Sequence, residues 1–279
     1  MRLMVLALCL SLATGGPTLM AEEDTIEALS PEAEAAALLQ AERTGRQIYL
    51  HDRAAEKVTD ALMRVRGFKR NRKLLGWITQ AQGDEIAVSF VGRGKDKQPA
   101  AFYRATVGHD GELIGKAESL REPEPLTDFE SAALRARAAA LESPYESCAK
   151  AYNTVVLPAD ESLEQWYVYL LPATTQAQVV PIGGSYRVDV DLSSDSTSVR
   201  PFTRSCIQLD SAQDTAAMLF SHLLDPVPTE IHVHWSLWAE TPLVVATPPG
   251  LPAITFQTPL QNGVTISDLP GPTGGIMLK

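Results

Sequence analysis

Two histidines and a glutamate stand at alternate positions in the segment PTEIHVHWSLW, residues 228–238. In a β-strand, Glu230, His232 and His234 would point to one side, and the apolar residues between them would point to the other. Imidazole and carboxylate groups suit Zn²⁺, and a catalytic zinc site keeps a fourth position open for water. His222, on the preceding segment, would add a ligand. The sequence therefore raises a zinc-dependent hydrolase as one hypothesis.

An ordinary strand produces the same pattern without any ligand role. An antiparallel sheet with one solvated face places polar residues at every second position. Trp238 continues this polar face and would crowd it with an aromatic ring. No His-Glu-x-x-His helix motif occurs in the chain. We therefore favour surface or structural histidines and expect no cofactor, with zinc as the alternative.

Other catalytic patterns are incomplete. Ser147 and Lys150 match the Ser-x-x-Lys of penicillin-binding enzymes, but the accompanying Ser-Asp-Asn and Lys-Thr-Gly motifs are absent from the sequence. Ser221, His222 and Asp225 are neighbours at the end of one expected helix, whereas a triad needs partners from different elements. These gaps favour a protein without catalytic activity.

A run of cations departs from the acidic character of the chain, whose formal net charge is −10. The six cations of residues 64–73 are Arg64, Arg66, Lys69, Arg70, Arg72 and Lys73. Such a patch could bind an acidic protein, lipid head groups or an envelope polyanion. The alternative is a solvated turn whose cations complement a helix dipole. The acidic total argues against general nucleic-acid binding.

The first residues have the features of a secretory signal peptide. Arg2 is followed by an apolar run, residues 3–13, which is too short to span a membrane. Cleavage fits after Gly15 or after Ala21, and we favour Ala21. We therefore expect a periplasmic or secreted protein. No later stretch is long and apolar enough to span a bilayer, so we expect no transmembrane anchor.

Two cysteines remain after the expected leader is removed, Cys148 and Cys206. In an oxidising compartment one disulfide is the favoured interpretation. A pair of metal-binding thiolates would need close Cys or His spacing, which neither residue has. A bridge across so long a loop would stabilise the fold by about 4 kcal/mol.

The pattern of apolar residues and turn signals predicts an α+β fold, with helices packed on antiparallel β-meanders. Helices are expected over 30–45, 52–67, 129–142 and 212–224. Strands are expected over 46–50, 74–81, 85–92, 100–107, 111–117, 151–158, 164–172, 185–192, 200–209, 229–238, 242–248 and 252–256.

Two halves with a similar helix-then-meander order are expected, which raises the hypothesis of a duplication. The expected organisation is a signal peptide over 1–21, an N-terminal α+β domain over 22–120, a linker and helix over 121–147, a disulfide-clamped β-rich domain over 148–257, and a flexible tail over 258–279.

The segments NTVVLP, WYVYLLPATT, GGSYRV, FTRSC and DPVPTEIHVHWSL resemble those of an uncharacterised family of exported proteobacterial proteins with no assigned activity. The resemblance covers roughly residues 148–247. In those relatives an apolar residue stands where this chain has His234. The resemblance implies export and a shared fold, and it implies no function.

The function we expect from the sequence is that of a non-catalytic, exported envelope protein. It would be a binding or structural module for an unidentified protein or cell-surface partner. Exposed aromatic side chains often supply binding energy at interfaces. The candidates, which we expect to be exposed, are Trp166, Tyr167, Tyr169 and Trp238.

Overall fold

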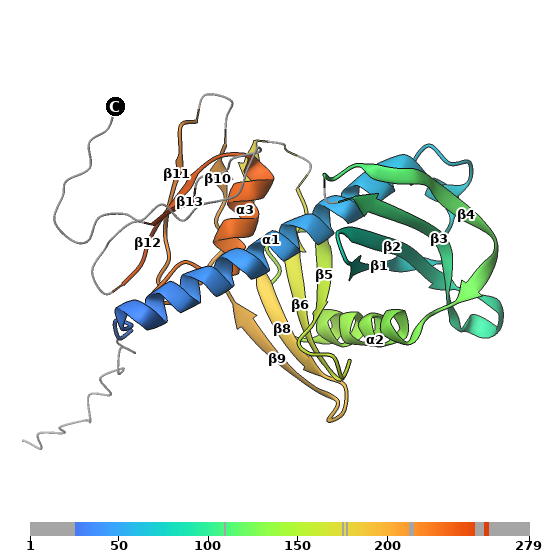
Figure 1. Ribbon diagram of the computed structural model, residues 1–279, viewed down its shortest axis with the longest axis horizontal. Helices are drawn as coiled ribbons and strands as arrows, with labels where there is room; N and C mark the ends of the chain where they lie inside the picture. Colours follow the sequence, from blue (N-terminus) through green and yellow to red (C-terminus); the bar gives the residue numbers. More distant parts are fainter. Residues whose placement is uncertain are drawn as a thin grey trace, which may run out of the picture.

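The computed structural model describes residues 26–108, 110–174, 176, 178–211, 215–248 and 254–256. The expected signal peptide with its two cleavage points, and the expected tail over 258–279, lie outside these residues. Within the described ranges, three α-helices and several antiparallel sheets confirm the α+β class (Figure 1). Across the described residues, none of the helices combines the length and apolar character needed to cross a membrane.

Helix α1 (Pro31–Leu62) is continuous over 32 residues, or about 48 Å. Ser30 caps its first turn, and Pro31 occupies the first helical position, as predicted. The predicted stop at Gly45 and the predicted strand over 46–50 are wrong. Gly45 lies where α1 crosses helix α3 (Glu230–Ala239), and a Cβ there would be 2.5 Å from Val233 Cβ. This glycine permits a close helix crossing and does not end the helix.

The N-terminal sheet has four antiparallel strands in the order β1-β2-β3-β4. They are β1 (Leu74–Gln82), β2 (Glu85–Arg93), β3 (Pro99–Gly108) and β4 (Leu113–Pro125). The C-terminal half of α1 packs on this sheet, where Val58 and Leu62 join one core with Val88 and Phe90. Strand β4 extends to Pro125, so the first five residues of the predicted linker belong to a strand.

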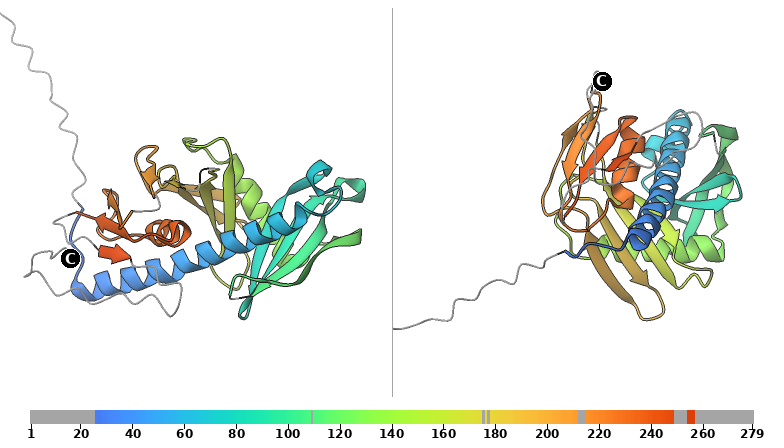
Figure 2. Two further views of the ribbon diagram at one scale, coloured as in Figure 1. Left: turned by 90° about the horizontal axis from the view of Figure 1, so that it is seen from above. Right: turned by 60° about the vertical axis from the view of Figure 1, so that its left-hand side comes forward.

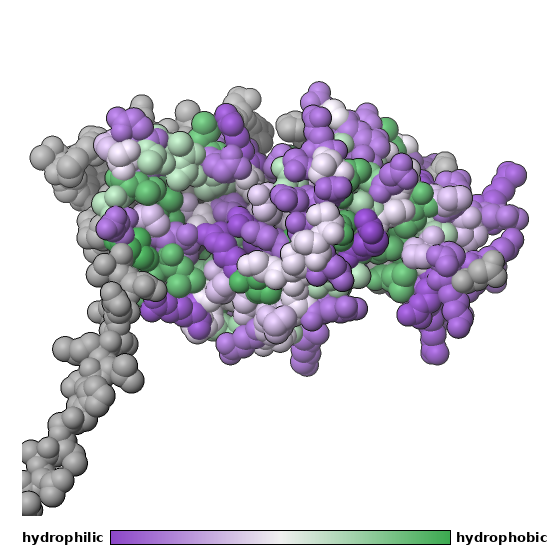
Figure 3. Space-filling model, turned by 90° about the horizontal axis from the view of Figure 1, so that it is seen from below, coloured by the Kyte–Doolittle hydropathy of each residue, from purple (hydrophilic) through white to green (hydrophobic). Residues whose placement is uncertain are grey.

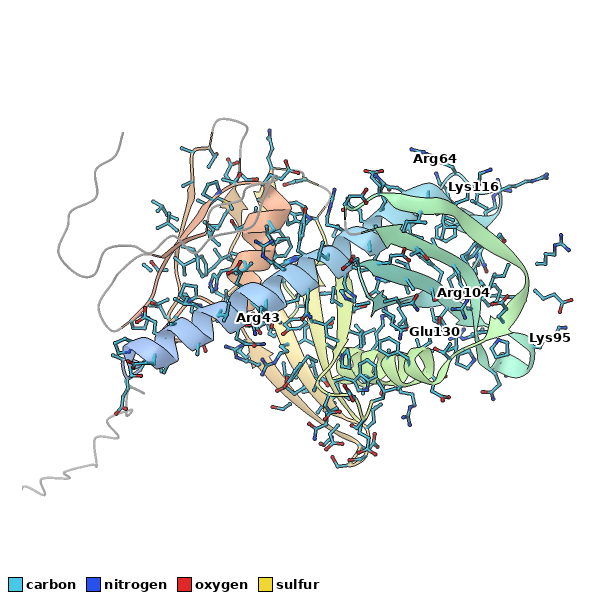
Figure 4. The ribbon with its side chains drawn as sticks, viewed as in Figure 1. Arg43, Arg64, Lys95, Arg104, Lys116 and Glu130 are labelled. Carbon is cyan, nitrogen blue, oxygen red and sulfur yellow. A yellow bond between two sulfur atoms is a disulfide. The ribbon has the colours of Figure 1, made fainter. Side chains whose placement is uncertain are left out.

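Helix α2 (Asp128–Glu142) begins at a capping box, in which Thr127 and Glu130 exchange hydrogen bonds. The Glu130 carboxylate also accepts hydrogen bonds from Arg104 of β3, one of them at 3.1 Å. Figure 4 shows these two side chains pointing toward one another. The ion pair therefore fixes the start of α2 against the N-terminal sheet.

The central sheet is a second antiparallel meander in the order β5-β6-β8-β9. Its strands are β5 (Tyr152–Pro158), β6 (Gln165–Pro172), β8 (Tyr186–Asp191) and β9 (Ser196–Pro201). Trp166, Val168 and Leu170 of β6 share a core with the alanines of α2. Tyr169 and Leu171 belong to the core on the opposite face, which also contains α3 residues. Because both faces are covered, β6 is apolar at nearly every position.

The remaining strands are short. Strand β7 (Val179–Val180) pairs with β10 (Leu209–Asp210). A three-stranded C-terminal sheet contains β11 (Met218–Ser221), β12 (Leu243–Ala246) and β13 (Ile254–Phe256). Two 3-10 turns, η1 (Phe68–Arg70) and η2 (Lys95–Lys97), lie in the N-terminal half. The predicted strand over 200–209 is thus mostly irregular, with β9 ending at Pro201.

The helix predicted over 212–224 is wrong for its described residues, because these include β11. Met218 and Phe220 are buried while Leu219 and Ser221 are exposed, which is the alternation of a strand. Strand β11 pairs in parallel with β12, a partner that follows only after α3 in the chain. Such a pairing leaves no short-range sequence signal.

Helix α1 joins the two halves of the molecule. Its N-terminal half packs beside α3, and its C-terminal half packs on the N-terminal sheet. Figure 2 shows α1 running along the molecule from the C-terminal sheet to the N-terminal sheet. The coarse helix-then-meander order predicted for both halves is present, with α1 before β1–β4 and α2 before β5–β9.

Candidate functional site

The predicted disulfide is formed between Cys148 and Cys206, whose sulfur atoms are 2.04 Å apart. It joins the segment before β5 to the segment after β9, so it links the two ends of the central meander. The Cys148 side chain lies against Gly184, where a Cβ would be only 2.4 Å from Cys148 Cβ. Gly184 has φ of +82°, so both its conformation and its contacts require glycine.

The strand on which the zinc hypothesis rested is not formed, because residues 230–239 are helix α3. On a helix, residues two apart point about 200° away from one another. His232 and His234 therefore face different surroundings. All residues from Glu230 to Ser236 are buried, so no solvent-facing stripe was available to reveal the helical period. The threonine before the helix, Thr229, with His232 three residues later, resembles a capping box and was the available local signal.

Glu230 is held by three side chains of the central sheet. Its Oε1 accepts a hydrogen bond of 3.2 Å from the Tyr169 hydroxyl. Arg187 and Arg200 approach the same oxygen at 3.5 and 3.6 Å. This carboxylate thus fixes the first turn of α3 to strands β6, β8 and β9.

His222 and His232 are neighbours in the core, with ring centroids 4.6 Å apart. His222 Nε2 donates to Asp225 at 2.8 Å, and the backbone N–H of Thr229 donates to His232 Nδ1 at 2.9 Å. Burial, followed by the charge of His222, lowers the pKa of His232 well below its usual value. A neutral His232 whose Nδ1 already accepts a hydrogen bond fits a structural role.

Asp225 connects this histidine pair to Arg200. Burial opposes ionisation of Asp225, but the hydrogen bond from His222 and the charge of Arg200 outweigh it and hold the pKa of Asp225 below its usual value. Arg200 Nη2 donates to Asp225 at 2.7 Å. The predicted ligands His222, His232 and Glu230 therefore lie in one polar network between α3 and the central sheet.

His234 lies outside this network. It is fully buried, and neither ring nitrogen has a hydrogen-bond partner among the described residues. Burial lowers its pKa to about 3. Among the residues that the structure describes, no three His, Cys, Asp or Glu side chains are arranged to hold a metal ion.

The predicted aromatic contacts are mostly internal. Trp166 and Tyr169 are buried, so the prediction that they are exposed is wrong. Trp238 is partly buried and packs edge-on against Trp235. Tyr167 alone of the four is substantially open, at 37% exposure, and Arg187 lies over its ring.

The six predicted cations lie on one exposed connection, which we call the basic turn (residues 64–73). It follows α1 and contains Gly67, with φ of +93°, and the 3-10 turn η1. Phe68 is buried between Phe90 and Tyr103, at ring distances of 5.4 and 5.2 Å. This aromatic anchor fixes the turn, while the six cationic residues around it are all exposed.

None of these six cations forms an ion pair with the described residues. The segment around this turn, from the last turns of α1 into β4, is also basic. Residues 57–121 contain thirteen Lys and Arg against seven Asp and Glu, whereas the whole chain has 24 against 34. The remaining residues therefore carry 11 against 27. Figure 4 places Arg64, Lys116 and Lys95 along the outer side of the N-terminal sheet.

Sequence reasoning missed a buried polar junction where α1 meets both sheets. His51 Nδ1 lies 2.7 Å from Thr79 Oγ1 of β1, and Asn153 of β5 donates to Asp52 Oδ1 at 3.2 Å. Burial lowers the pKa of His51 to about 4. Burial, with the charge of Glu56, raises the pKa of Asp52 to about 7. The only local signal was a pair of adjacent ionisable residues, His51 just before the helix expected over 52–67 and Asp52 at its start.

Comparisons with known proteins add no assignment to this geometry. No protein-family model matches the chain, and searches of curated proteins and of solved structures found no match.

Proposed function

We propose that this protein is an exported, non-catalytic envelope protein that binds an anionic component through its basic turn. The single observation that carries the proposal is the set of six exposed cations without ion-pair partners in the described residues. An acidic chain gains nothing for folding from such a concentration of like charges. Clustered cations attract anionic partners over a distance of about 8 Å at physiological salt.

The alternative explanation, that these cations complement the dipole of α1, has little support. The last turn of α1 contains no basic residue, and the helix ends at Leu62. The dipole effect falls off within the last turn. Arg64 is the nearest of the six, and the others extend to Lys73, beyond η1. Most of these charges therefore require another explanation.

Export is supported by the disulfide between Cys148 and Cys206. Structural disulfides form and persist in oxidising compartments and are rare where thiols are kept reduced. The signal-peptide pattern expected at the start of the chain leads to the same compartment.

A zinc-dependent hydrolase, the alternative raised by the sequence, has less support. Glu230 is bound by Tyr169 and two arginines, and His232 Nδ1 already accepts a backbone hydrogen bond. His234 lies on another side of α3. These side chains hold α3 in place, which accounts for their burial.

The proposal is tested by elution from immobilised heparin in a salt gradient. The test variant replaces three cations of the basic turn, Arg66, Lys69 and Arg72, by glutamine. The matched control carries the same change of charge at exposed cations outside residues 57–121, namely Arg43→Gln, Lys150→Gln and Arg204→Gln. We expect the parent and the control to elute together and the test variant to elute at lower salt. Co-elution of all three proteins would refute the proposed role of the basic turn.

A further inference from the structure

We infer that the partner of the basic turn is an anionic phospholipid surface, against which the N-terminal sheet end of the molecule docks. This inference rests on the proposed function and adds the chemical class of the partner. It depends on three features of the structure: the dispersed cations, the apolar side chains among them, and the charge asymmetry of the whole molecule.

The first feature is the spread of the cations over an outer surface. Small anions are bound by donors that converge in a pocket. The structure has a pocket of about 290 Å³ at the far end of the central sheet, around Tyr167 and Asp189, and no residue of the basic turn lines it. The exposed cations continue beyond the turn at Arg93, Lys95, Lys97, Lys116 and Arg121. An extended anionic surface can satisfy such dispersed charges together.

The second feature is the exposure of large apolar side chains on the same end. Met63, directly before Arg64, is 44% exposed, and Ile114 of β4 is 48% exposed. Lys116, which is also exposed, follows Ile114 by two residues, across the irregularity of β4 at Gly115. The ion pair between Lys57 and Glu112, at 2.8 Å, holds the start of β4 beside the last turns of α1.

Figure 3 shows the lower side of this end of the molecule, where long hydrophilic side chains project and hydrophobic surface is visible between them. Apolar side chains flanked by Lys and Arg are typical of proteins that rest in a membrane interface. The apolar groups enter the boundary of the acyl chains while the cations stay with the head groups. A soluble polyanion would pair with the cations and leave Met63 and Ile114 exposed to water.

The third feature orients the molecule. The excess of positive charge lies within residues 57–121, and the rest of the chain is strongly acidic. An anionic membrane attracts the first part and repels the second. The field therefore favours a single orientation, with the N-terminal sheet toward the lipid and the opposite end of the molecule, where the first turn of α1 carries Glu32 and Glu34, away from it.

The inference is tested by co-sedimentation with phosphatidylcholine vesicles prepared with and without phosphatidylglycerol. We expect the parent to bind only the vesicles that contain phosphatidylglycerol. Each Lys or Arg near an anionic surface contributes about 1 kcal/mol, so loss of Arg66, Lys69 and Arg72 should weaken vesicle binding by about a hundredfold. The control with Arg43, Lys150 and Arg204 replaced should bind nearly as the parent does.

A second variant separates lipid from other anions. Met63→Ser with Ile114→Ser should weaken vesicle binding while heparin elution stays unchanged, because only a membrane offers an apolar interior. Heparin retention without vesicle binding would overturn the lipid inference and leave the proposed function standing. If the parent protein bound neither heparin nor vesicles, both the proposed function and the lipid inference would be refuted. Equal binding of the serine variant and the parent to vesicles would also contradict the inference.

Discussion

Asp52 is a buried carboxylic acid on α1, and replacing it by asparagine should stabilise the protein increasingly as the pH rises. Its pKa is raised from 3.8 to about 7, and burial is the main cause. Asn153 donates a hydrogen bond to Asp52 Oδ1 at 3.2 Å. An asparagine at position 52 has nearly the same shape and keeps an oxygen that can accept this bond. The substitution therefore removes the ionisation and retains the contact.

The magnitude follows from the two pKa values. Between pH 4 and pH 7 the folded protein keeps a proton on Asp52 that the unfolded chain has released. The free energy of unfolding therefore falls as the pH rises through this window. A difference of about three pKa units corresponds to about 4 kcal/mol, which is fully developed at pH 8. At pH 5 the same calculation gives about 1.5 kcal/mol.

The assay is urea unfolding of the parent and of Asp52→Asn at pH 5 and pH 8. The stability gained by the variant should grow by about 2 to 3 kcal/mol between these pH values. Asp60→Asn, at an exposed acid on the same helix, provides the control and should show no such growth. His51 titrates in the opposite sense, but it is present in both proteins and cancels in the difference. An equal gain at both pH values would show that Asp52 ionises normally and would refute the argument.

Three further variants test the packing and the disulfide. His234→Leu should raise stability by about 1 to 3 kcal/mol at pH 7, because it removes two buried nitrogens that have no hydrogen-bond partner among the described residues. The gain in urea unfolding should grow as the pH falls below 6.5, where the unfolded histidine binds a proton, and a loss of stability would contradict this prediction. Gly45→Ala should destabilise by about 1 to 3 kcal/mol despite the better helix propensity of alanine, because its Cβ would lie 2.5 Å from Val233 Cβ; a higher melting temperature would disprove the close crossing. Replacing both Cys148 and Cys206 by serine should cost about 4 kcal/mol and abolish the sensitivity of the melting temperature to reductant; an unchanged melting temperature would exclude a stabilising role for the bridge.

Part of the candidate site could be predicted from the sequence. The six cations of the basic turn and the two cysteines were identified by residue type and compartment alone. Their significance still depended on the fold, because the sequence allowed the cations to complement a helix dipole. The end of α1 at Leu62 argues against the helix-dipole explanation, and the lack of ion pairs in the described residues supports the proposal of an anionic partner.

The sequence by itself determined the elements whose signals are local. Apart from β9, the β-strands of both meanders alternate or are continuously apolar, and α2 has its capping box, so a short window of residues contains enough information. The same holds for the start of α1 at Ser30 and Pro31. The α+β class followed from these elements.

Only the tertiary structure decided the segments whose partners are distant in the chain. The sequence pattern of residues 230–239 predicted a strand, because burial on all sides removes the polar stripe that would show a helical period. Gly45 was predicted to end a helix, because the residue that requires a glycine there, Val233, lies on another helix. Strand β11 depends on its parallel pairing with β12. In each case long-range packing outweighs local preference, since the free energy of burial exceeds the small differences in intrinsic propensity.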